Sequence, residues 1–151
     1  MDKDWFVERM EENSDKLFRV AYTLLENRED CRDALQETAL KAWEKRFTLR
    51  NPQYFSTWIT RILINVSRDI QRKRKRTVPL EEAPEPFADP PDSTLALALK
   101  KLPEKLRLPL MLQYSEGMSY SEIARALRVT EPSVRGRIHR AKEQLRKELE
   151  E

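Results

Sequence analysis

The stretch from Ser119 to Leu149, SYSEIARALRVTEPSVRGRIHRAKEQLRKEL, carries side chains that can bind nucleic acid. Its candidate contacts are Ser133, Arg135, Gly136, Arg137, His139 and Arg140. Arginine can pair with guanine through two hydrogen bonds or can bind a phosphate, and a glycine lets the backbone come close to a ligand. This combination indicates a surface that contacts double-stranded DNA.

Two helix starts in the same stretch would position those side chains. Ser119 with Glu122 forms a capping box, which predicts a helix over 120–127, and Thr130 with Pro132 is typical of the start of a second helix. The inner face of that second helix would consist of Val134, Ile138, Ala141 and Leu145. The pattern is that of a helix-turn-helix whose second helix enters the major groove. The alternative is an ordinary helical hairpin with a basic, solvated face.

A second group of side chains suited to nucleic acid lies within a helix predicted over 54–76. Arg61, Asn65, Arg68 and Arg72 follow one another at intervals of 4, 3 and 4 residues, so they share one helix face. Asparagine is a poor helix former with no capping role in mid-helix, which suggests that its amide recognises a base. The sequence therefore predicts a surface that follows phosphates and ends in the basic run 72–76, with a solvated basic face as the alternative.

A helix predicted over 29–46 has two faces that could be buried. Small and apolar side chains form the first face, namely Cys31, Ala34, Leu35, Thr38 and Ala42. The second face, about 150° away, consists of Gln36, Leu40, Trp43 and Phe47. Either both faces are internal, or the second face binds a large partner with Gln36 and Glu37 as polar anchors beside Leu40 and Trp43.

Composition and proline placement predict an all-α chain of two small helical domains. The sequence is 36% charged and has only two glycines among 151 residues. Segment 77–94 contains five prolines and five acidic residues but no Lys or Arg, so it is predicted to be a linker between domains 1–76 and 95–151. Each domain carries a net charge of +4 and the linker −5, which gives two basic blocks joined by an acidic one.

Further helices are expected within these two blocks. In the first block we expect helices over 4–12, 14–27, 29–46 and 54–76; in the second, Ser93 or Thr94 caps a helix, and Pro103 starts another that runs to Tyr114. A single cysteine, Cys31, and a single histidine, His139, leave little material for a metal site or a catalytic triad, so no metal and no cofactor are expected. The chain is expected to be cytoplasmic, without membrane insertion, because it lacks a long apolar stretch and its N-terminus is charged.

Three stretches together resemble an extracytoplasmic-function (group IV) sigma factor of bacterial RNA polymerase, in the sigma-70 family. They are DALQETALKAW (33–43), FSTWITRILINVSRDIQRKRKR (55–76) and LPLMLQYSEGMSYSEIARALRVTEPSVRGRIHRAKEQLRKEL (108–149). The resemblance implies that 1–76 is a region 2-like domain that binds core polymerase and the minus-ten element. It also implies that 95–151 is a region 4-like helix-turn-helix domain that binds the minus-thirty-five element.

The resemblance assigns roles to the faces described above. The group Gln36, Glu37, Leu40 and Trp43 would bind the clamp helices of core RNA polymerase. Asn65, with the loop 49–54, would recognise an unpaired base of the minus-ten element, in a pocket lined by Tyr54 or Phe55. Arg61, Arg68, Arg72 and the basic tail would hold phosphates, and Ser133, Arg135, Gly136, Arg137, His139 and Arg140 would read the minus-thirty-five duplex. The second domain would also bind the polymerase flap, the acidic linker would run toward the RNA-exit path, and an anti-sigma factor is a further expected partner.

Two positions differ from the pattern of the family. Arg128 stands where the helix-turn-helix turn usually has glycine, and this costs about 1 kcal/mol if the backbone there is left-handed. Gly136 stands where the recognition helix commonly has serine, so the promoter sequence cannot be transferred. A stand-alone helix-turn-helix regulator is the alternative function, and an enzyme acting on nucleic acid lacks a nucleophile pair or carboxylate cluster.

Overall fold

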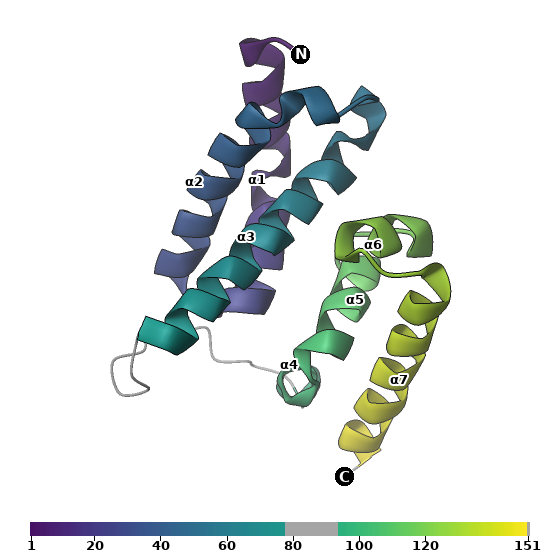
Figure 1. The fold of residues 1–151 in the computed structure, drawn as a ribbon. Coiled ribbons are helices and arrows are strands. Elements are labelled where there is room, and N and C mark those ends of the chain that lie inside the picture. The colour runs from purple at the N-terminus through teal and green to yellow at the C-terminus, as the bar shows by residue number, and fades with distance from the viewer. Residues whose placement is uncertain (78–93, 151) are drawn as a thin grey trace. The chain divides into compact units, whose positions relative to one another are not determined.

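The computed structural model describes residues 1–77 and 94–150, and every regular element in this part of the chain is a helix (Figure 1). The all-α prediction is therefore confirmed. The chain divides into two compact units, Met1–Phe87 and Ala88–Glu151. The predicted linker 77–94 lies outside the described residues except for its two ends, as does the predicted cap Ser93.

The first unit is a bundle of three helices, α1 (Lys3–Leu25), α2 (Arg28–Glu44) and α3 (Phe55–Thr77), in which consecutive helices run in opposite directions (Figure 1). Only Glu26 and Asn27 separate α1 from α2. Glu26 adopts a left-handed conformation with φ of 58°, and the Asn27 side chain accepts a hydrogen bond of 2.8 Å from the Asp30 amide. This tight connection fixes the two helices side by side, because one residue ends α1 and the next caps α2.

The N-terminal helix is one element where the sequence predicted two, 4–12 and 14–27. The Asn13 side chain donates 2.8 Å to the Arg9 carbonyl within the continuous helix, and Ser14 and Asp15 are exposed. The predicted break was wrong because the polar run at 12–15 occupies a solvent-facing turn and contains neither glycine nor proline.

The core of this unit lies between large side chains of α1 and α3 and small side chains of α2. The buried residues of α1 and α3 include Leu17, Val20, Leu25, Ile59, Leu63 and Ile64, and those of α2 are Cys31, Ala34, Thr38 and Ala42. Small residues let α2 pack closely, since interaxial distance depends on the side chains at the contact. The first face predicted for the helix over 29–46 is thus the core face.

An aromatic cluster joins the N-terminus of α1 to the start of α3. Phe6 packs edge-on against Trp43 at 5.3 Å between ring centroids, and Trp5 packs against Phe55 at 5.5 Å. Two short 3₁₀ turns, η1 (Arg46–Thr48) and η2 (Pro52–Tyr54), lie between α2 and α3. Trp58 donates 3.0 Å from Nε1 to the Thr48 hydroxyl, which ties η1 to α3.

The second unit consists of α4 (Thr94–Lys101), α5 (Glu104–Tyr114), α6 (Tyr120–Leu127) and α7 (Glu131–Glu150), and α7 packs against the other three. The capping box predicted for α6 is present: the Glu122 amide donates 3.1 Å to the Ser119 hydroxyl, and the Ser119 amide donates 3.0 Å to the Glu122 carboxylate. The Ser133 amide donates 3.2 Å to the Thr130 hydroxyl at the start of α7. The helix-turn-helix predicted from the sequence is therefore confirmed.

None of the helices in the described ranges, 1–77 and 94–150, is both long enough and apolar enough to span a membrane.

Substitution of Arg128 tests how much its conformation in the helix-turn-helix turn lowers the stability of the second unit. It closes α6 with φ of 57° and ψ of 46°, the left-handed conformation that a side chain disfavours. We expect Arg128→Gly to raise the free energy of unfolding of the second unit by up to about 1 kcal/mol, because relief of the left-handed strain outweighs the greater flexibility of glycine. Denaturant unfolding of the full chain measures the change.

The matched control is Arg125→Gly, at an exposed position inside α6. It should lower the free energy of unfolding by about 1 kcal/mol, the usual cost of glycine within a helix. Equal losses for both variants would show that the turn at Arg128 is not strained.

Candidate nucleic-acid interfaces

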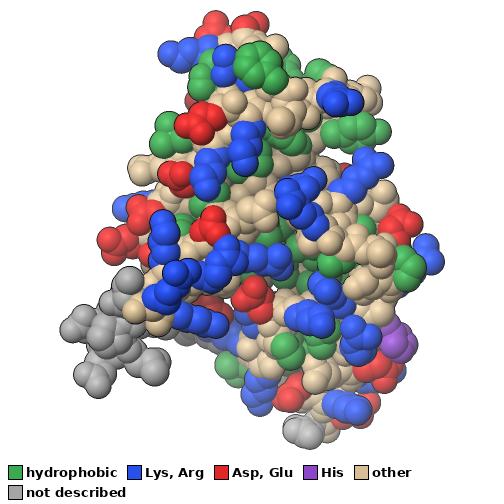
Figure 2. Space-filling view, in the orientation of Figure 1, with side chains coloured by type: hydrophobic (Ala, Val, Ile, Leu, Met, Phe, Trp, Pro, Cys, Tyr) green, Lys and Arg blue, Asp and Glu red, His purple; other side chains and the backbone are tan. Residues whose placement is uncertain are grey.

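The α3 basic strip, defined as Arg61, Asn65, Arg68 and Arg72, lies on the side of α3 away from the core. Asn65 and Arg72 are exposed and the other two are half-buried, whereas Ile59, Leu63 and Val66 on the other side are buried. Lys and Arg side chains gather over this helix in Figure 2. The structure therefore brings together the four residues that the sequence placed on one face.

The acidic neighbour of the strip is Asp69. It forms an ion pair with Arg72, and Lys41 of α2 approaches it to 4.0 Å. Both side chains of the Arg72 pair are well exposed, and exposed ion pairs contribute about 0–1 kcal/mol. A phosphate could therefore replace Asp69 as the partner of Arg72 at little cost.

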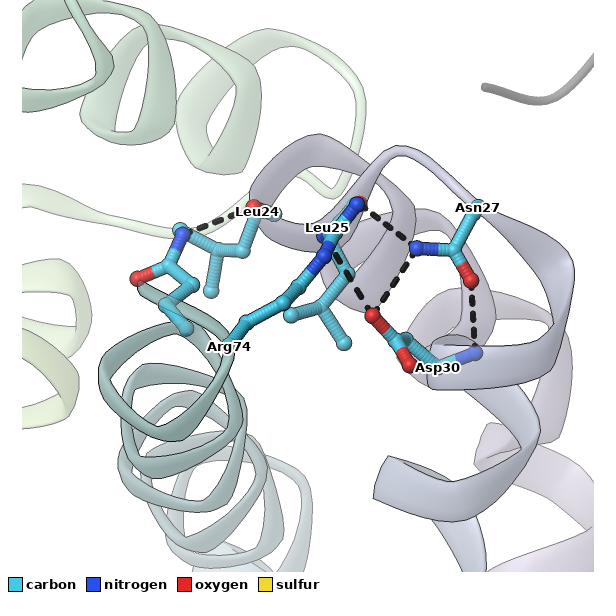
Figure 3. Close-up of polar contacts among 6 residues, drawn as sticks. Leu24, Leu25, Asn27, Asp30 and Arg74 are labelled. Carbon is cyan, nitrogen blue, oxygen red and sulfur yellow. Dashed lines mark hydrogen bonds and ion pairs between the residues drawn. The ribbon is translucent and has the colours of Figure 1, made fainter. Parts of the chain in front are cut away.

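The basic run after Arg72 is split between two sides of the helix. Arg74 turns inward: its Nη1 donates 3.1 Å to the Leu25 carbonyl and lies 3.3 Å from the Asp30 carboxylate (Figure 3). Arg76 lies one turn after Arg72 and is exposed. In the basic tail, whose phosphate contacts stay a prediction, Arg74 is thus bound to the ends of α1 and α2.

Tyr54 and Asn65, expected to recognise one unpaired base, lie on successive elements: Tyr54 ends η2, and Asn65 lies within α3. Tyr54 lies at the end of η2 and is 51% exposed, while its neighbour Phe55 is buried in the aromatic cluster and can line no pocket at the surface. Asn65 comes ten residues after Phe55, the first residue of α3, which places it about 15 Å along the axis from the start of that helix. The expectation that Asn65 and the loop 49–54 recognise one unpaired base stays a prediction.

The second candidate interface is the outer face of α7. Val134, Ile138 and Ala141 are buried against the rest of the unit. Among the six predicted contacts, Arg135, His139 and Arg140 are exposed, and Ser133, Gly136 and Arg137 are partly exposed. The structure thus presents most of the predicted group on the surface of the N-terminal half of α7.

Arginines of α7 differ in what surrounds them. The Arg140 guanidinium lies over Gly136, where an added Cβ would be 3.3 Å from Nη1. The Arg135 guanidinium lies 5.4 Å from the ring centroid of Tyr120, the first residue of α6. The Nε of Arg137 is buried and has no hydrogen-bond partner in the described parts of the chain. Arg140 and Arg135 are therefore positioned on the outer surface, and Arg137 is partly turned toward the unit.

A third candidate surface lies on α2. Gln36 and Glu37 are exposed and Leu40 is 62% exposed, so the second face predicted for the helix over 29–46 is not part of the core. Trp43 is half-buried, since it packs against Phe6. The group Gln36, Glu37, Leu40 and Trp43 offers an apolar surface with polar neighbours, as protein interfaces do.

Sequence reasoning missed two arginines, Arg46 and Arg135, as partners of aromatic rings at these surfaces. The Arg46 guanidinium lies 4.1 Å from the Trp43 ring and 4.5 Å from the ring of Phe47, which is 79% exposed. Tyr120, which supports Arg135, was identified only as a helix start. The spacing of Trp43, Arg46 and Phe47 at i, i+3 and i+4 was the available signal for the first contact.

The single cysteine belongs to the core rather than to a reactive site. Cys31 is fully buried, and burial, with a smaller contribution from Asp30, raises its pKa to about 11. The thiol is therefore protonated at neutral pH and packs as a small apolar side chain.

Comparison with known families assigns both units. Sigma-70 region 2 matches residues 10–77, and Sigma-70, region 4 matches residues 93–145. These ranges hold the α3 basic strip and the outer face of α7, respectively.

Curated relatives match nearly the whole chain. The ECF RNA polymerase sigma factor SigW of Bacillus subtilis is 31% identical, over 98% of this chain and 90% of that protein. The ECF RNA polymerase sigma factor SigE of Mycolicibacterium smegmatis is 34% identical over 92% of this chain, which spans 59% of the length of that protein.

A solved structure with a similar fold is the sigma factor RpoE from Bartonella quintana in complex with the anti-sigma factor NepR. It has a TM-score of 0.80 and 25% sequence identity, and it covers 99% of this chain and 98% of that one. The sequence matches and this fold agree with the order of the two units, and the chain belongs to the extracytoplasmic-function group of the RNA polymerase sigma factors.

Proposed function

We propose that this chain is a transcription initiation factor that binds core RNA polymerase, recognises promoter DNA and helps to open it. The observation that carries the proposal is the α3 basic strip, an exposed Asn65 among three arginines on the side of α3 away from the core. Family membership supports initiation over the alternative of a stand-alone regulator, because region 2 precedes the helix-turn-helix unit. The factor acts in the cytoplasm, and we assign no catalytic step to it, since RNA synthesis belongs to the polymerase.

The first unit, residues 1–76 in our assignment, captures the minus-ten element as a single strand. Arg61, Arg68 and Arg72 neutralise successive phosphates, and the Asn65 amide hydrogen-bonds to the edge of an unstacked base. Tyr54, exposed at the end of η2 just before α3, stacks on an unpaired base of the same strand. Promoter opening follows because both contacts are made only once the bases leave the duplex.

The second unit, residues 95–151 in our assignment, binds the minus-thirty-five element as a duplex. The N-terminal half of α7 enters the major groove, where Arg135, His139 and Arg140 reach base edges or phosphates. Gly136 lets the helix come close, and Ser133 lies near the start of α7 where backbone amides favour a phosphate. Arg137 contributes less, since part of its side chain is buried.

Core polymerase binds through two surfaces in this proposal. Gln36, Glu37, Leu40 and Trp43 contact the clamp helices, and the second unit contacts the flap. An anti-sigma factor is a further partner, supported by the complex of the similar Bartonella quintana sigma factor. The assignment of 77–94 as the linker between the units stays a prediction.

Run-off transcription with core RNA polymerase on a genomic library tests the proposal. Addition of the chain should yield new transcripts that share two conserved promoter elements. A failure to associate with core enzyme in a pull-down, together with tight binding to ordinary duplex DNA, would instead support the stand-alone regulator.

Asn65→Ala should separate the two DNA contacts. It removes the amide that hydrogen-bonds to the unpaired base, at a cost of about 1–3 kcal/mol in binding single-stranded minus-ten DNA. Binding of a minus-thirty-five duplex should be unchanged. Fluorescence anisotropy of the full chain with each labelled DNA measures both affinities, and equal losses for the two DNAs would contradict the assignment of Asn65.

Gly136→Ala should stabilise the protein yet weaken duplex binding. Alanine favours the helix by roughly 0.5–1 kcal/mol over glycine, whereas its Cβ, 3.3 Å from Arg140 Nη1, makes the guanidinium shift by a few tenths of an ångström. Thermal unfolding and duplex affinity of the full chain provide the two measurements. We expect a higher unfolding midpoint together with a several-fold weaker affinity for the preferred minus-thirty-five duplex.

Arg140→Ala supplies the comparison for that variant. If Arg140 depends on the space at Gly136, the double variant should bind no more weakly than Arg140→Ala alone, because the interaction is already lost. Additive losses would show that the two positions act independently.

A further inference from the structure

The carbonyl end of α1 is closed by side chains from α3. Helix α1 has no basic residue in its last turn, and its final carbonyls lack partners within the helix. Gln71 donates 2.7 Å from Nε2 to the Leu24 carbonyl, and Arg74 donates 3.1 Å from Nη1 to the Leu25 carbonyl. We call this pair of contacts the α3–α1 cap. The cation that the negative end of α1 favours is thus supplied by another helix.

The start of α2 completes the cap. Arg74 Nη1 lies 3.3 Å from an Asp30 carboxylate oxygen, and the Asn27 Nδ2 donates 2.9 Å to the same oxygen and 3.3 Å to the Leu25 carbonyl (Figure 3). Asn27 is 2% exposed, and the side chains of Arg74 and Asp30 are 26% and 16% exposed. The guanidinium therefore has a fixed, largely sheltered position between two helix ends.

Helical geometry then divides the basic run 72–76. Gln71 and Arg74 are three residues apart and share the side of α3 that carries the buried residues Leu63 and Ser67. Arg72 and Arg76 lie four residues apart on the side of the α3 basic strip. Within this run Arg74 turns inward while the other four cations are exposed, although the run looks uniform in sequence.

We propose that Arg74 is a positioning residue, which with Gln71, Asn27 and Asp30 holds the last turns of α3 in place so that Arg72 and Arg76 face the nucleic acid. Arg74 itself contacts no phosphate. The proposal deepens the function proposed above and rests on it, because it names the residue that orients the strip. Without the cap, the crowded cations of the last turn repel one another and the turn frays.

Arg72→Met and Arg74→Met provide a matched test in the full chain, since the two variants have identical composition and net charge. Arg74→Met should accelerate amide hydrogen exchange in residues 72–76 by about tenfold, the effect of losing a charge-assisted hydrogen bond. Arg72→Met should leave exchange unchanged. Hydrogen exchange followed by mass spectrometry or NMR measures this difference.

The salt dependence of binding to a single-stranded minus-ten oligonucleotide separates positioning from contact. Arg72→Met should reduce the slope of log affinity against log salt by about 0.7, because one phosphate contact is lost. Arg74→Met should weaken binding several-fold with an unchanged slope. The bound state keeps its phosphate contacts, and only the fraction of free protein whose last turns of α3 are correctly positioned for binding falls. A reduced slope for Arg74→Met with unchanged exchange would overturn the proposal.

Asp30→Asn is a second test, with Glu29→Gln as its control. Both remove one acidic charge from the first turn of α2, but Glu29 is exposed and outside the cap. Electrostatics alone predicts slightly tighter DNA binding for both. The cap predicts faster exchange in 72–76 and weaker binding for Asp30→Asn only, and identical behaviour of the two variants would overturn it.

The outcomes also distinguish this proposal from the function on which it rests. If Arg72→Met left binding unchanged, the α3 basic strip would not be a nucleic-acid contact. Faster exchange in Arg74→Met would then still support the cap as the device that holds α3.

Discussion

Helix α3 is constrained to fill the core of its bundle and to display the α3 basic strip at the same time. Its period of 3.6 residues makes this possible, because residues three and four apart return to the same side. Ile59, Leu63 and Val66 meet the core, whereas Asn65 and Arg72 remain exposed. Core packing thereby fixes the rotation of the helix about its axis, and that rotation fixes where the strip points.

The second unit solves the same problem with α7. Val134 and Ile138 hold the helix against its own unit, and Arg140 lies outside over Gly136. The direction in which α7 leaves α6 depends on the turn at Arg128, where a residue in the left-handed conformation ends α6. The strain of this turn therefore acts on the stability of the unit, whereas the exposed arginines of α7 act on what the unit binds.

The sequence predicted the elements whose causes are local. The capping box of Ser119 and Glu122 follows from residues within one turn of each other and was foreseen, whereas a left-handed Arg128 entered only as a condition attached to the family resemblance, and the structure shows it. The inward turn of Arg74 could not be foreseen, because its acceptor is a backbone carbonyl 49 residues away. That carbonyl is available as an acceptor because α1 ends at Leu25. The false break at Ser14 has a related cause, in that a polar run on the solvent side of a long helix resembles a connection.

Two Arg–Asp pairs formed by arginines of α3 show how burial assigns different roles to like residues. The pair of Arg72 and Asp69 is well exposed, so water and salt compete with it and a phosphate can take the place of the carboxylate. The pair of Arg74 and Asp30 is sheltered and shares its atoms with a helix-end carbonyl. To break it would leave Asn27 as the remaining side-chain partner of both the Asp30 carboxylate and the Leu25 carbonyl, a loss of about 1–3 kcal/mol in comparable sites. Two arginines that are two residues apart thus differ in which partner they can exchange, and this difference arises from the helix period rather than from residue type.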